Sequence, residues 1–216
     1  MLGNILSPLQ MLYNIPAIVV AFTLHEFMHA SVADKLGDPT PRLQGRLSLN
    51  PIMHIDPIGF LMVILMGFGW AKPVNINSAN FTNPKKANIL VSVAGPLTNL
   101  ALAFLFYGFF YFSADLTVMQ NPVFVGIYRP FIYINLMLFA FNILPIPPLD
   151  GFHVIENVIH YQNYQTIMTL RRYGFIILIV LGFLGVLSRY LGFVYGALML
   201  IFNGLFSLID KFAGLF

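Results

Sequence analysis

The sequence contains no cysteine, and only 9% of its 216 residues are charged. The absence of cysteine excludes a disulfide scaffold and a metal site built from thiolates. A soluble domain carries about 25% charged residues, so the low charge content excludes a typical cytosolic enzyme. It also excludes a disordered chain, because disorder requires low hydrophobicity and many charges.

Apolar residues make up 58% of the chain, and its mean hydropathy is +0.81. A soluble fold of this size has too little interior to hide so much apolar surface. We therefore predict an all-α polytopic membrane protein, with residues 1–216 forming one membrane-embedded domain. No separate signal peptide is expected, because the N-terminus lacks a basic region before its first apolar run.

The apolar runs predict about five transmembrane helices, at roughly 9–34, 89–112, 123–144, 173–187 and 190–209. The run over 57–70 is short for a spanning helix and fits a re-entrant or interfacial segment. Loose alternation of apolar and polar residues over 42–49 predicts a small β-hairpin. The stretch over 152–172 is amphipathic and lies between spans.

The net charge of +3 and the pI of about 9.2 do not indicate nucleic-acid binding, because the basic residues sit in short loops between apolar runs. In such loops they set membrane orientation, and the side richer in Lys and Arg faces the cytoplasm. If successive spans cross the membrane in opposite directions, Arg129 and Arg189 lie on or near the outer side. The same arrangement puts nine basic residues on the cytoplasmic side, namely Lys35, Arg42, Arg46, Lys72, Lys85, Lys86, Arg171, Arg172 and Lys211.

The end of the first predicted span carries the sequence HEFMH, with His25 and His29 four residues apart. Residues i and i+4 share one helix face, so both imidazoles can bind one Zn²⁺ ion. Glu26, beside the metal, can then take a proton from water as a general base. The alternative is a group of ordinary polar residues near a helix end. Polar residues in an apolar span are expensive unless they face a partner or cavity, which favours the metal site.

A catalytic zinc site needs about three protein ligands, so a third must come from elsewhere. Asp150 follows a proline-rich break, Pro145 to Pro148, that a helix cannot cross unbroken. Irregular backbone of this kind can hold a side chain in a cavity at membrane depth. Asp150 is therefore the predicted third ligand, and the alternative role is an N-cap of the following helix. Asp34 and Asp38 are too near in sequence to the histidines to fold back easily. Asp115 lies on the opposite side of the membrane, and Asp210 lies at the chain end.

The segments HEFMHA and NILPIPPLDG resemble the two signature motifs of the site-2 protease family of intramembrane zinc metalloproteases. The segment from Gly95 to Asn99 resembles the family's AGPxxN element, and the likeness extends over most of residues 15–155. The stretches GRLSLNPIMHIDPIG and GFGWAKPVN further resemble the small bacterial and archaeal members, of the type without a PDZ or CBS domain. The resemblance implies His25, His29 and Asp150 as zinc ligands, Glu26 as catalytic base, and cleavage of membrane protein or peptide substrates within a lipid bilayer.

Three further polar residues are candidates for binding substrate, namely Asn99, Asn142 and His54. Asparagine is costly in lipid, so both amides should face the interior, where they could bind an extended peptide or a developing oxyanion. A helix–helix hydrogen bond is the alternative for each. His54 lies just before the short apolar run, and a structural role is its alternative. The main rival function is a metal-ion transporter with a buried His, Glu and Asp site, and a homo-oligomer remains open.

Overall fold

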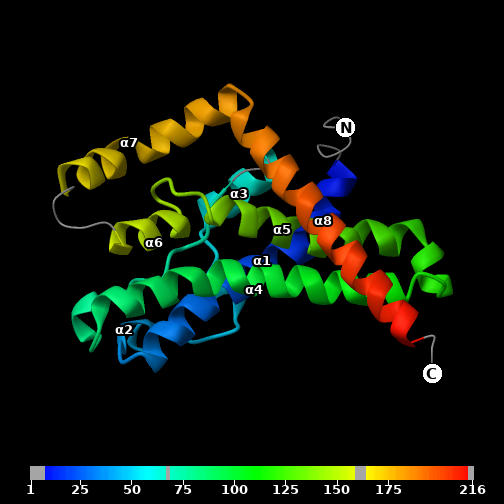
Figure 1. Ribbon diagram of the computed structural model, residues 1–216, viewed down its shortest axis with the longest axis horizontal. Helices are drawn as coiled ribbons and strands as arrows, with labels where there is room; N and C mark the ends of the chain where they lie inside the picture. The colour runs from blue at the N-terminus through cyan, green and yellow to red at the C-terminus, as the bar shows by residue number, and fades with distance from the viewer. Residues whose placement is uncertain (1–7, 67–68, 159–163, 214–216) are drawn as a thin grey trace.

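A computed structural model describes residues 8–66, 69–158 and 164–213 of the chain, which are helices joined by short loops (Figure 1). The α-helices are α1 (Pro8–Lys35), α2 (Thr40–Leu43), α3 (Pro57–Met66), α4 (Pro84–Phe112), α5 (Pro122–Asn142), α6 (Asp150–Val158), α7 (Tyr164–Phe183) and α8 (Val186–Ala213). The loops contain three short 3-10 helices, η2 (Pro51–Met53), η3 (Ser78–Asn80) and η4 (Thr117–Gln120).

Five of these helices, α1, α4, α5, α7 and α8, are long and apolar enough to cross a membrane. The prediction of an all-α chain with about five spanning helices is therefore confirmed. The fourth span differs in extent, since α7 begins at Tyr164 rather than near Tyr173. Arg171 and Arg172, which suggested a boundary in the sequence, lie inside α7, and part of the predicted amphipathic stretch falls in 159–163, outside the described residues.

Helices α1, α4 and α5 pack against one another and form the centre of the molecule (Figure 1). Their contact surfaces are rich in alanine, and Ala21, Ala33 and Ala103 are fully buried. Small side chains let membrane helices approach closely without a large hydrophobic driving force. As a result, a polar side chain on one helix can reach a partner on the next.

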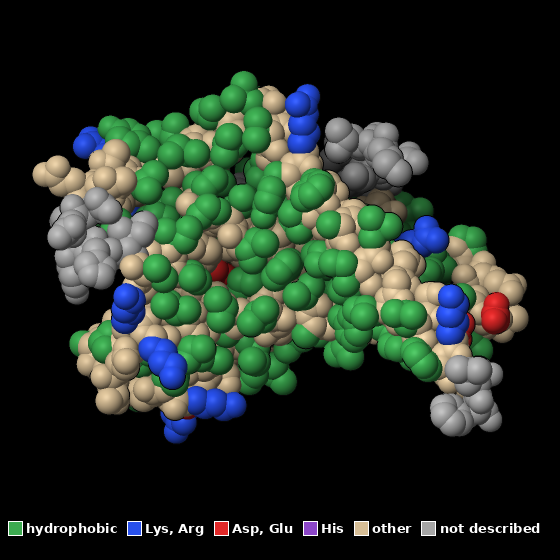
Figure 2. Space-filling view, in the orientation of Figure 1, with side chains coloured by type: hydrophobic (Ala, Val, Ile, Leu, Met, Phe, Trp, Pro, Cys, Tyr) green, Lys and Arg blue, Asp and Glu red, His purple; other side chains and the backbone are tan. Residues whose placement is uncertain are grey.

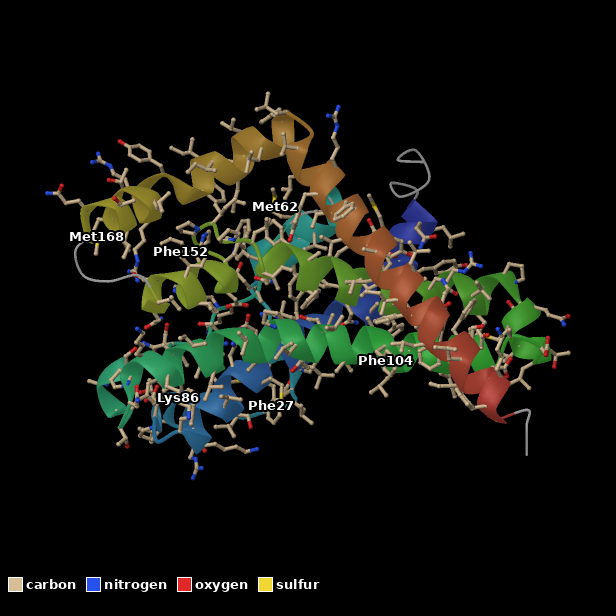
Figure 3. All side chains as sticks on the ribbon, in the orientation of Figure 1. Phe27, Met62, Lys86, Phe104, Phe152 and Met168 are labelled. Atoms are coloured by element: carbon tan, nitrogen blue, oxygen red, sulfur yellow. The ribbon has the colours of Figure 1, made fainter. Side chains whose placement is uncertain are left out.

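Aromatic packing attaches α8 to the far half of α4. The ring of Phe104 lies 5.3 Å from that of Phe202 and 4.8 Å from that of Phe206, and Figure 3 shows Phe104 on α4 close to α8. Phe206 also contacts Phe112, at the C-terminal end of α4, with ring centroids 5.7 Å apart. The C-terminal ends of α4 and α8 therefore lie together.

This packing corrects the predicted position of Lys211. The residue lies five positions after Phe206, at the end of the molecule where α4 finishes, whereas Lys86 marks the other end of α4 (Figure 3). Strict alternation of spans was the wrong assumption, because the aromatic contacts orient α8 along α4 and not against it. The other eight basic residues assigned to the cytoplasmic side belong to elements near the His25–His29 end of α1.

The predicted β-hairpin over 42–49 is wrong. Residues 40–43 form α2, which has proline in its first turn, a position that favours a helix. Gly45 then turns the chain with a φ of 69°, and the buried Arg46 guanidinium donates to the carbonyl oxygens of Met53, Lys72 and Pro73. Among the described residues, the bridge between Ile55 and Ala71 is the one strand-like pairing.

A re-entrant membrane segment over 57–70 is not supported either. The apolar run forms α3, a helix of 10 residues and therefore about 15 Å long, while residues 67–68 lie outside the described chain. The two ends of the run meet, because the Lys72 N–H donates to the carbonyl oxygen of His54 at 2.8 Å. The loop that follows is thereby brought back towards α1.

Asp38 fixes this returning loop to the end of α1. Its side chain is fully buried and accepts hydrogen bonds from the backbone N–H groups of Thr40 and Asn77, the Thr40 hydroxyl and the Asn80 amide. Burial raises the pKa of the Asp38 carboxyl, but the four donors lower it by more, so that the net pKa lies below its ordinary value. The charged carboxylate therefore stabilises the folded loop.

We expect Asp38→Ala to lower the free energy of unfolding by about 3 kcal/mol, because it leaves several buried donors without an acceptor. An SDS-unfolding titration of detergent-purified protein measures the change, and Asp115→Ala, at an exposed loop position, is the matched control. Because the folded-state pKa is lowered, the stabilisation is present above the unfolded-state pKa and is lost as the pH falls through the folded-state pKa. Equal stability of the two variants would contradict the assignment.

Candidate metal centre

His25 and His29 lie one turn apart on α1, and both are buried. Their Nε2 atoms are 3.0 Å apart, and the two rings meet edge to face with centroids separated by 4.6 Å. The i, i+4 spacing thus brings both nitrogens to one point on the helix surface.

Asp150 reaches the same point from a distant part of the chain. Helix α5 ends at Asn142, and α6 begins with Asp150 after the proline-rich break. A Cβ atom on Gly151 would lie 2.3 Å from the carbonyl oxygen of Ile143, so only glycine allows this tight return. The return places Asp150 Oδ2 at 3.3 Å from His25 Nε2 and 3.4 Å from His29 Nε2.

The three side chains fit a bound divalent metal ion. Asp150 Oδ2 is buried and has no hydrogen-bond partner, although an unsatisfied carboxylate oxygen is costly. A tetrahedral zinc ion with ligand bonds of about 2.0–2.2 Å places its donor atoms roughly 3.3–3.6 Å apart. The two separations from Asp150 Oδ2, 3.3 and 3.4 Å, match that spacing, and the 3.0 Å between the imidazole nitrogens is slightly shorter.

The outer nitrogen of each imidazole is held by its own acceptor. His25 Nδ1 lies 2.6 Å from Asn99 Oδ1, and His29 Nδ1 lies 2.7 Å from the carbonyl oxygen of Val91. Because both partners are acceptors, Nδ1 carries the proton in each ring and the Nε2 lone pairs point towards Asp150. This is the arrangement by which proteins commonly orient metal-binding histidines.

Gly95 forms the wall of α4 that faces the two imidazoles. A Cβ atom at this position would lie 2.4 Å from His29 Nε2 and 2.6 Å from His25 Nε2. No side chain can occupy that space without moving the rings. The backbone of α4 therefore closes one side of the centre directly.

Glu26 lies next to His25 on α1 and is buried at the edge of the centre. Its Oε2 atom accepts a hydrogen bond of 3.2 Å from the backbone N–H of Val74, in the loop that Asp38 and Arg46 secure. The carboxylate thus has one oxygen fixed by the loop and lies beside the histidine pair.

A cavity of about 750 Å³ opens from the metal centre. His25, Glu26, His29 and Asp150 line its inner part. Its outer part includes Arg171 of α7, which binds Glu156 of α6 at 2.7 and 2.8 Å. Figure 2 shows acidic side-chain atoms at the bottom of a hollow on this face of the molecule. The cavity can therefore admit a peptide segment and water to the ligand group.

Of the three residues predicted to bind substrate, Asn142 lines the cavity, whereas Asn99 and His54 do not. The Asn142 amide donates to the carbonyl oxygen of Leu138 at 3.0 Å. Asn99 is fully buried against His25. His54 is also fully buried, where its Nε2 atom lies 2.6 Å from the carbonyl oxygen of Ser48, and it is not part of the cavity lining. A role for His54 in binding substrate stays a prediction.

Sequence reasoning missed Asn135 and Val74. Asn135 is fully buried between helices, where its Oδ1 atom accepts from the Asn99 amide at 2.8 Å. Its signal in the sequence is an amide in an otherwise apolar span, which is costly unless it has a partner. Val74 acts through its backbone N–H, which leaves no mark in the sequence.

Comparison with known proteins identifies one family and several similar proteins. The family model of peptidase family M50 matches residues 117–181. The chain is 41% identical over 175 residues to the Bacillus subtilis protein "Putative zinc metalloprotease YwhC", an alignment that covers 78% of this chain and 79% of that protein. It is 28% identical over 180 residues to "Putative zinc metalloprotease Rip2" of Mycolicibacterium smegmatis, covering 80% of this chain and 67% of that protein. No solved structure matches the chain.

We expect Gly95→Ala to weaken zinc binding by about 10- to 100-fold, because overpacking costs about 1–3 kcal/mol and the rings must move. Alanine favours a helix over glycine, so the loss would not come from α4 itself. Competition with a chromophoric chelator measures the affinity. Gly196→Ala on α8 is the matched control, since nothing lies within 4 Å of its Cβ position. Unchanged zinc affinity in Gly95→Ala would contradict the assigned contact.

Proposed function

The chain belongs to peptidase family M50, and we propose that this zinc metalloprotease hydrolyses peptide bonds in or near the membrane-spanning segments of protein substrates. The observation that carries the proposal is the convergence of His25, His29 and Asp150 at a buried point beside Glu26 and a cavity. One carboxylate and two imidazoles are a common ligand set for catalytic zinc.

In this proposal, zinc is held by the Nε2 atoms of His25 and His29 and by Asp150 Oδ2. Zinc in such a shell supplies Lewis acidity, which activates water and polarises a carbonyl group. Asn99 and the Val91 carbonyl keep both imidazoles in the ligand tautomer, and Gly95 leaves the space that the rings need.

Glu26 acts as general base in the proposed reaction. Its carboxylate takes a proton from the attacking water and returns it to the leaving amine. The Val74 N–H supports this role, because its hydrogen bond fixes one carboxylate oxygen of a side chain that lines the cavity. In this proposal Asn142, which lines the cavity, binds the carbonyl group of the substrate.

The depth of the centre supports a membrane substrate. His25 lies ten residues before the end of α1, which corresponds to about 15 Å along the helix. Half the hydrocarbon thickness of a bilayer is also about 15 Å. A substrate helix hides its peptide bonds in its own hydrogen bonds, so it must unwind locally to enter the cavity.

A metal-ion transporter is the alternative, and the structure does not favour it. A permeation path needs polar and ionisable groups in both halves of the membrane. Across the described residues, one group of three potential ligands is found, and no second group continues a path across the membrane. Helices α7 and α8 add no ligand to it.

We expect Glu26→Gln to retain zinc but to lower cleavage of a model transmembrane substrate by about 10²- to 10⁴-fold, because the ligands stay and the base is lost. Zinc content and substrate cleavage are measured on the same detergent-purified sample. Asp210→Asn, at an exposed position on α8, is the control. Cleavage by Glu26→Gln at the control rate would remove Glu26 as the base, whereas zinc uptake into liposomes would support the transporter.

We propose that the centre faces the cytoplasmic side of the cell membrane, as the eight basic residues near it suggest. Because the chain has no cysteine, an introduced cysteine is its only thiol. Leu43→Cys, 81% exposed on α2, should react with an impermeant maleimide only from the cytoplasmic side, and Asp115→Cys only from outside. The reverse labelling pattern would invert the orientation.

A further inference from the structure

A continuous chain of polar side chains crosses the three central helices. Asn135 on α5 is linked to Asn99 on α4, and Asn99 is linked to His25 on α1. The two links measure 2.8 Å between Asn99 Nδ2 and Asn135 Oδ1, and 2.6 Å between Asn99 Oδ1 and His25 Nδ1. Both amides are fully buried, so water cannot replace either link.

The hydrogen bonds in this series of side chains all run in one direction, from His25 through Asn99 to Asn135. The Asn135 amide nitrogen donates to the carbonyl oxygen of Phe131 on its own helix at 2.7 Å, which leaves Asn135 Oδ1 facing α4. That oxygen accepts from Asn99 Nδ2, whose second hydrogen points to the carbonyl oxygen of Ala21 at 3.3 Å. Asn99 Oδ1 is then left as the acceptor for His25 Nδ1. A flipped Asn99 amide would oppose two oxygens at one end and two N–H groups at the other.

The two histidines differ in what fixes them. His29 donates to the carbonyl oxygen of Val91, a backbone atom held by the α4 helix. His25 depends on a side-chain amide that could rotate. Two acceptors oppose this rotation, Asn135 Oδ1 at 2.8 Å and the Ala21 carbonyl oxygen at 3.3 Å, and the shorter of the two contacts belongs to Asn135. Asn135 is not part of the cavity lining, and the contacts of its amide are with Asn99 and Phe131. The hydrogen-bonded path from Asn135 to the metal centre therefore runs through Asn99.

We propose that Asn135 is a positioning residue, which aligns the Asn99 amide and thereby keeps the Nε2 atom of His25 available to the metal. The inference rests on the proposed role of His25 as a zinc ligand. The competing explanation is that Asn135 merely joins α5 to α4, as interhelical amides commonly do. The two explanations differ in zinc affinity and in how the effects of Asn135 and Asn99 combine.

The experiment measures zinc affinity by chelator competition, together with thermal stability, for detergent-purified wild type, Asn135→Leu, Asn99→Leu and the double variant. Asn135→Leu should bind zinc about 10- to 100-fold more weakly, which is typical when an outer-shell partner is lost. In the Asn99→Leu background, Asn135→Leu should cause no further loss, because its effect acts through Asn99. The isosteric Asn135→Asp, whose neutral carboxyl offers the same acceptor and donor, should stay within about threefold of wild type.

Asn203→Leu is the matched control, because the Asn203 amide also joins two helices, accepting from Tyr107 and donating to Met199, but does not contact His25. It should lower stability while leaving zinc affinity unchanged. Wild-type affinity in Asn135→Leu, or losses that simply add in the double variant, would overturn the inference alone. If Asn135→Leu does not fold, Asn135→Ala takes its place in the same comparison. A wild-type protein that binds no zinc would overturn the proposed function and this inference with it.

Discussion

The close approach of α4 to α1 at Gly95 is the contact on which the metal centre depends. A single Cβ atom there would lie within 2.6 Å of the Nε2 atoms of both His25 and His29. Because α4 comes so near, its own atoms supply the acceptors for both rings, the Val91 carbonyl and the Asn99 amide. One small residue therefore decides whether the imidazoles have room and whether they have partners.

A buried carboxylate oxygen without a hydrogen-bond partner distinguishes the centre from other buried polar groups. Three buried side-chain atoms among the described residues lack a partner, namely Thr23 Oγ1, His54 Nδ1 and Asp150 Oδ2. Asp150 Oδ2 alone belongs to the group of potential ligand atoms that lie within 4.8 Å of one another. An orphaned oxygen facing two lone pairs repels them unless a cation lies between, which is why this geometry points to a metal.

The sequence allowed the helical class and the ligand group to be predicted, because each left a strong local signal. The i, i+4 histidines lie in an apolar run, and Asp150 follows a break that only an irregular turn can accommodate. The hairpin failed because alternation over eight residues is weaker than the preference of Pro41 for a first helical turn. Lys211 was misplaced because aromatic contacts between α4 and α8, which join residues about a hundred positions apart, set the direction of α8.

The two histidines are held by different kinds of acceptor, and only one of these acceptors can be recognised in the sequence. The acceptor for His29 is a backbone carbonyl, which any residue at position 91 would offer, so nothing in the sequence marks it. The acceptor for His25 needs an amide, and that amide needs a second one, so two asparagines appear in apolar spans where they are otherwise unfavourable. A side-chain substitution in α4 or α5 can therefore remove the acceptor of His25, but it cannot remove the backbone acceptor of His29. The acceptor of His29 would be lost only if the α4 backbone itself moved.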